Sequence, residues 1–130
     1  MGLTTRLSTG PGRVLTAVYA VFAISSSARA GLQLATKLSE APVAYLLSAF
    51  AAAVYVVATV GLARDLRRVA WVAVLVELTG VLVVGTLSYV DAQAFPDATV
   101  WSGFGSGYGY VPLVLPVLGV LWLLRTRRTP

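Results

Sequence analysis

Cysteine and histidine are both missing from this chain of 130 residues, and only five residues are acidic. Without cysteine there is no disulfide and no thiolate nucleophile. Without histidine there is no imidazole to hold zinc or haem or to change charge near neutral pH. Because the commonest protein ligands for metals and cofactors are missing, we expect neither a cofactor nor a metal site.

Polar segments that would cover a soluble domain are scarce as well. Hydrophobic residues make up 58% of the chain and the mean hydropathy is +0.83, which is more apolar surface than one small core can enclose. In lipid only helices and closed barrels satisfy every backbone hydrogen bond. Barrel strands would alternate apolar and polar residues, whereas the apolar runs here are continuous. The sequence therefore predicts an all-α, polytopic membrane protein.

Apolar runs and prolines set the expected helix limits. The second run begins at Pro42, a residue favoured in the first turn of a helix, and residues 42–63 cover about 33 Å, enough to cross the hydrocarbon. The fourth run covers only about 22 Å, so it requires flanking residues or a locally thinner bilayer. The prediction is one membrane domain, an up-down four-helix bundle with spans 14–33, 42–63, 69–89 and 110–124 and an outer loop 90–109.

Basic residues in short loops mark the cytoplasmic side of a membrane. With four spans, one side collects Arg6, Arg13, Arg64, Arg67, Arg68, Arg125, Arg127 and Arg128, and the other side receives Arg29 and Lys37. We expect both termini to be cytoplasmic. The same bias accounts for the net charge of +5, so the expected partner is the lipid bilayer and not nucleic acid. A cleaved secretory signal ending near Ala30 stays open as an alternative, and it would leave three spans with an external N-terminus.

Glu77 is the most informative polar residue. It lies about 12 Å from the inner boundary of the third span, where a charged carboxylate is costly, so it should be protonated, paired or in contact with a wet cavity. Depth along the helices offers Tyr55 as a partner, and Tyr19 and Thr79 are further candidates. The group either binds a proton or cation for function, or links neighbouring helices by a hydrogen bond.

Arg29 lies about 22 Å from the inner end of the first span. It can extend outward to lipid phosphate, pair with Asp91 or Glu40 at the outer mouth, or partly neutralise Glu77. The serines just below it, Ser26 among them, either line a polar path or bond to their own helix.

The outer loop combines carboxylates, aromatic rings and glycine. Glycine occupies every second position from Gly103 to Gly109, but no Lys-Ser/Thr pair follows, so a nucleotide site is not expected. A short interfacial helix beginning at Pro96 and an amphipathic lid are the simplest prediction. The candidates for an outer contact with a ligand or partner are Asp91, Asp97, Trp101 and Tyr108.

Three segments carry a family resemblance: APVAYLLS at 41–48, FPDATVW at 95–101 and YVPLVLP at 110–116. Together they resemble the uncharacterised small integral membrane proteins of actinobacteria, which implies a bacterial inner (plasma) membrane and no particular activity. The size also invites comparison with small multidrug resistance transporters, but that family carries its carboxylate in the first span, whereas Glu77 is in the third. The arginine bias favours one orientation, so any homo-oligomer should be parallel.

Three function classes remain open. An accessory or interaction protein of a larger membrane complex is favoured, because the loops are short and no catalytic constellation is found. The alternative is a small proton- or cation-coupled transporter or channel that uses Glu77. An enzyme would depend on Asp91, Asp97 or Glu77 for acid–base work. The first two classes differ in whether Glu77 faces a water-accessible cavity.

Overall fold

The computed structural model describes residues 7, 9–36, 39, 42–91, 99 and 101–126. These residues form helices and no β-strand, so the all-α class is confirmed. In chain order the elements are α1 (Pro11–Thr36), α2 (Pro42–Ala63), α3 (Arg67–Val90), a 3₁₀-helix η2 (Ser102–Tyr108) and α4 (Val111–Arg125).

Three of the helices, α1, α2 and α3, are long and apolar enough to cross a membrane. Helix α4 has only 15 residues, but with η2 it forms a bent pair, angled at 101°, that qualifies as a fourth candidate. The loop expected at 90–109 thus contains helical structure against the bundle. Helix α1 continues unbroken past Ala30 to Thr36, beyond the limit expected at residue 33.

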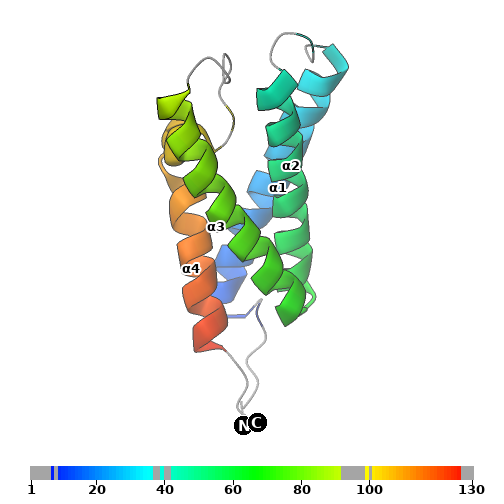
Figure 1. The fold of residues 1–130 in the computed structure, drawn as a ribbon. Helices are drawn as coiled ribbons and strands as arrows, with labels where there is room; N and C mark the ends of the chain where they lie inside the picture. Colours follow the sequence, from blue (N-terminus) through cyan, green and yellow to red (C-terminus); the bar gives the residue numbers. More distant parts are fainter. Residues whose placement is uncertain are drawn as a thin grey trace.

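Helices α1 and α2 lie side by side, while α3 contacts both α2 and α4 (Figure 1). The start of α1 and the end of α4 meet at one end of the bundle, because Trp122 Nε1 donates a hydrogen bond to the Leu7 carbonyl at 2.9 Å. The Leu7 N–H donates in turn to Asp65 Oδ1, in the α2–α3 turn, at 3.1 Å. We call this the arginine-rich end, and the opposite one the η2 end.

Arg67 joins the start of α3 to the end of α4 at the arginine-rich end. Its guanidinium donates to the Leu123 carbonyl at 2.6 Å and to the Thr126 hydroxyl at 3.1 Å. The last carbonyls of a helix have no partner within the helix and carry partial negative charge. Arg67 therefore caps the C-terminus of α4 from another element.

Aromatic rings from the segment that leads into α4 pack against two glycines of α3. A Cβ on Gly80 would lie 2.5 Å from the Trp101 ring, and one on Gly85 would lie 2.3 Å from the Phe104 ring. Both rings occupy space that any larger residue would fill. These glycines therefore serve packing within the chain, which holds η2 against α3 (Figure 1).

Candidate functional site

A polar cluster lies at the centre of the bundle, and we call Tyr19, Tyr55, Glu77 and Trp101 the central cluster. Glu77 is 0% exposed. The Tyr19 hydroxyl donates a hydrogen bond to Glu77 Oε1 at 2.5 Å and so connects α1 to α3. Gly119 of α4 lies against this hydroxyl, since a Cβ there would be 3.4 Å from it. The carboxyl is thus enclosed where α1, α3 and α4 meet.

Tyr55 links the second helix to the same cluster. Trp101 Nε1 donates to the Tyr55 hydroxyl at 3.1 Å, and the ring of Tyr55 lies 6.2 Å from that of Tyr19, centroid to centroid. Since the Tyr55 oxygen accepts from Trp101, its own proton is available to another group. Glu77 Oε2 makes no hydrogen bond within the described part of the chain, and Tyr55 contacts Trp101 through its hydroxyl and Tyr19 through its ring. We therefore describe Tyr55 as a neighbour of Glu77 and Tyr19 as its partner.

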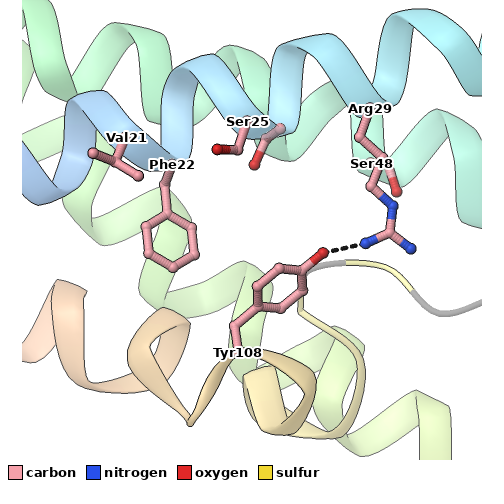
Figure 2. A pocket seen from close by; sticks show the side chains of 7 residues that line it. Val21, Phe22, Ser25, Arg29, Ser48 and Tyr108 are labelled. Carbon is pink, nitrogen blue, oxygen red and sulfur yellow. Dashed lines mark hydrogen bonds between the residues drawn. The ribbon is translucent and has the colours of Figure 1, made fainter.

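A second polar group lies nearer the η2 end, in a cavity of about 220 Å³ that we call the polar cavity. Its lining comes from α1, α2 and η2 and consists of Val21, Phe22, Ser25, Ser26, Arg29, Ser48 and Tyr108. Figure 2 shows Arg29 reaching across from α1 to η2, where its guanidinium donates a hydrogen bond to the Tyr108 hydroxyl.

Aromatic rings separate the two polar groups. Phe22 lines the polar cavity, and its ring lies 6.0 Å from that of Tyr108 on one side and 5.4 Å from that of Tyr55 on the other. Tyr55 is itself 0% exposed. Phe22 thus contacts both groups, and neither Tyr55 nor Glu77 is among the described residues that line the polar cavity.

The structure divides the residues that the sequence grouped together. Glu77, Tyr19 and Tyr55 do come together, whereas Arg29 and Ser26 join Tyr108 in the polar cavity. Thr79 is exposed and lines an apolar groove between α2 and α3.

The outer-contact candidates are also separated. Trp101 is 1% exposed and belongs to the core, while Tyr108 lines the polar cavity. Asp91 is exposed at the end of α3, and Asp97 lies outside the described residues. Ser48 was missed by sequence reasoning. Its signal was one of the few hydroxyl groups in the second run, together with Tyr45, Tyr55 and Thr59.

No family model, curated protein or solved structure matches this chain. Within the described ranges, no three acidic side chains come together in a way that could hold a metal ion. Any functional assignment must therefore come from the geometry of the central cluster and the polar cavity.

Proposed function

We propose that this protein is a four-span resident of a bacterial plasma membrane, with both termini cytoplasmic, that acts as an accessory or interaction protein in the bilayer. Large apolar side chains remain exposed along every long helix, for example Val14 at 66%, Phe50 at 50% and Val83 at 50%. Water would penalise such surfaces, whereas lipid and partner helices solvate them. The arginine bias between the two ends supports the orientation.

The enclosure of Glu77 is the observation that carries this proposal. A coupling carboxylate must exchange its proton or cation with water during each cycle, so it needs a wet route. Glu77 is 0% exposed, accepts its hydrogen bond from Tyr19, and is not among the described residues that line the polar cavity. A neutral carboxyl in this position links α1 to α3, which is the role of an interhelical hydrogen bond in a membrane bundle.

Infrared difference spectroscopy on the reconstituted protein tests this role. The Glu77 carboxyl band is identified by its loss in Glu77→Gln, and external pH is varied between about 5 and about 9. We expect a band that stays at the frequency of the protonated acid and does not respond to added Na⁺ or K⁺. A band that titrates with external pH, or shifts with either cation, would show a reachable site and favour the transporter instead.

Site-specific photocrosslinking in cells tests the interaction role directly. The apolar groove between α2 and α3 is about 430 Å³ and is lined in part by Leu75, Thr79 and Val83. A photoreactive residue at Leu75 or Val83 is expected to give a covalent adduct with a second membrane protein or a second copy. The same residue at Val60, exposed on α2 and outside that lining, serves as control. Adducts with lipid alone at all three positions would contradict the proposal.

A further inference from the structure

Helices α1 and α4 leave a groove between them along one side of the bundle. Helix α1 packs mainly against α2, and α4 packs mainly against α3 and η2. The groove has a volume of about 460 Å³, and we call it the α1–α4 groove. Its lining runs from Pro11 to Val18 on α1 and from Val111 to Arg125 on α4, at intervals of three and four residues. That spacing places the lining residues on one face of each helix.

The walls of the groove are apolar except at the arginine-rich end. Aliphatic side chains such as Val114 and Leu118 make up most of the lining, and both of these are 48% exposed. Trp122 and Arg125 line the groove where α4 ends, and none of the described lining residues is acidic. The groove therefore suits a ligand with a long hydrocarbon part and a negative charge at one end.

The charged end of the groove is fixed by contacts within the chain. The Trp122 indole donates its hydrogen bond to the Leu7 carbonyl, and it lies against Gly12, where a Cβ would be 2.5 Å from the indole nitrogen. These contacts hold the start of α1 to the end of α4. The indole cannot turn into the groove without losing its hydrogen bond, so the groove stays open beside it.

Arg125 is the charged group of this site. Its side chain is exposed and makes no hydrogen bond or ion pair with the described residues. Asp65 is the only described acidic residue at this end, and it belongs to the α2–α3 turn, where its carboxylate accepts from the Leu7 N–H. A guanidinium has five donors in a planar fork that matches phosphate oxygens. Arg125 can therefore bind an anionic headgroup.

Depth along α4 matches a lipid that stands in one leaflet. Tryptophan favours the level of the headgroups, and Arg125 lies one turn, about 4.5 Å, beyond Trp122, at the level that lipid phosphates occupy. From Arg125 back to Val111 the lining covers about 21 Å, which exceeds one leaflet, about half of a hydrocarbon core of about 30 Å. A whole acyl chain can thus lie along the groove while its headgroup stays beside Arg125.

We propose that the α1–α4 groove binds a phospholipid with an anionic headgroup from the leaflet at the arginine-rich end. The headgroup pairs with Arg125, and one acyl chain lies between α1 and α4 against Val114 and Leu118. The inference rests on the membrane placement proposed above. It favours a lipid over a partner helix because the one charge in the lining lies at the depth of lipid phosphates, in a leaflet whose surface is negative.

Native mass spectrometry of the full chain tests the headgroup. Protein released from vesicles of equal phosphatidylglycerol and phosphatidylcholine is expected to retain phosphatidylglycerol preferentially. Arg125→Gln should lower that preference roughly fivefold, the effect of one basic residue near an anionic lipid surface, and Arg125→Lys should keep most of it. Arg64→Gln is the matched control, because it removes the same charge at the same end but lies in the α2–α3 turn, outside the groove lining. Equal losses in Arg125→Gln and Arg64→Gln, or equal retention of both lipids by the wild type, would overturn the site.

A second pair of variants tests the acyl chain. Val114→Trp fills the groove and should lower retention of long-chain phosphatidylglycerol severalfold. Val117→Trp should not, because Val117 is exposed to a similar extent on the same helix, at 43%, but does not line the groove. The same retention in both variants would overturn the placement of the chain.

Two other occupants are separated in the same spectra. Glycerol phosphate is expected to leave lipid retention unchanged, and competition by it at equal concentration would indicate a soluble-anion site and overturn the lipid. A dimer mass that disappears in Val114→Trp would assign the groove to a second copy of the chain, with the same consequence. None of these variants touches the central cluster or the groove between α2 and α3. Failure here is therefore distinct from the infrared and photocrosslinking outcomes that would contradict the proposed function.

Discussion

At the scale of single residues, the centre of the molecule is governed by how a carboxyl group is satisfied far from water. An ionised carboxylate in a membrane interior requires a cation or several donors, and the described residues around Glu77 supply a phenol and no ion pair. A neutral carboxyl group needs fewer hydrogen-bond partners, since one oxygen accepts from Tyr19 and the protonated oxygen can turn toward Tyr55. The hydrogen bond then contributes to stability without holding a charge.

Removing the Tyr19 hydroxyl should therefore weaken the bundle by a modest amount. We expect Tyr19→Phe to lower the free energy of unfolding by about 1 kcal/mol, because Glu77 Oε1 loses its donor while the ring stays in place. Unfolding in mixed micelles monitored by circular dichroism gives this value. Tyr110→Phe is the matched control, because Tyr110 is 49% exposed, and it should change stability by a few tenths at most. Equal effects in the two variants would exclude a special role for the Tyr19–Glu77 bond.

At the scale of elements, the 101° bend between η2 and α4, which we call the η2 corner, is held by aromatic side chains that pack against glycines of α3. Gly103, Phe104 and Gly105 all have positive φ angles, a conformation that non-glycine residues seldom adopt. Phe104 accepts it while its ring lies against Gly85. The local backbone thus follows from tertiary packing.

Gly80→Leu should displace this corner. The new side chain would compete with the Trp101 ring for the same space, and overpacking of this kind costs about 1–3 kcal/mol. The variant should show a lower unfolding temperature and a changed near-ultraviolet circular dichroism spectrum. Gly31→Ala is the control, since a Cβ there meets nothing within 4 Å, and its higher helix propensity should leave stability equal or slightly raised. An unchanged spectrum in Gly80→Leu would contradict the packing described here.

The helix cap made by Arg67 allows a comparison between neighbouring arginines. Arg67→Ala removes the donors to Leu123 and Thr126 and should lower the free energy of unfolding by about 1–2 kcal/mol. Arg68→Ala removes the same charge from an exposed position and should have a much smaller effect. Thermal unfolding of the two variants side by side measures the difference, and no difference would mean that the cap contributes little.

Some of these elements could be predicted from the sequence and others could not. Helix α2 has the predicted limits because Pro42 starts it and the Arg64–Asp65 turn ends it. Depth along a helix is also readable, since each residue rises 1.5 Å, which is why Tyr55 was matched to Glu77. Tyr19 and Thr79 were named as further candidates. Rotation about the helix axis was not used. Thr79 is two residues from Glu77, about 200° around the helix, and faces away.

The η2 corner and the polar cavity were beyond the reach of such an argument. Trp101 was assigned to an outer lid because an aromatic residue near glycines suits a membrane interface, yet it is buried against Gly80. Arg29 was compared with Glu77, Asp91 and Glu40; the structure places it against Tyr108, and Glu40 lies outside the described residues. Both contacts join residues more than twenty positions apart in the sequence. Both also depend on the path of the chain around η2, where positive φ angles at residues 103–105 follow from tertiary packing.

At the scale of the whole molecule, charge is unevenly distributed between the two ends. The turn that joins α2 to α3 carries Arg64, Arg67 and Arg68, and α4 ends at Arg125. The described part of the η2 end carries Arg29, whose guanidinium is engaged with Tyr108. A bundle with this asymmetry should insert in one orientation, with the arginine-rich end in the cytoplasm.

The absence of cysteine makes this orientation directly measurable, since single cysteines can be introduced without background. Ser106→Cys places a thiol on an exposed position of η2, and Arg64→Cys places one in the exposed α2–α3 turn. We expect a membrane-impermeant maleimide to label Ser106→Cys in intact cells and Arg64→Cys only after the membrane is opened. Labelling of Arg64→Cys alone in intact cells would invert the proposed topology, because both termini would then be external. Labelling of both in intact cells would indicate two coexisting orientations and rule out a strictly parallel assembly.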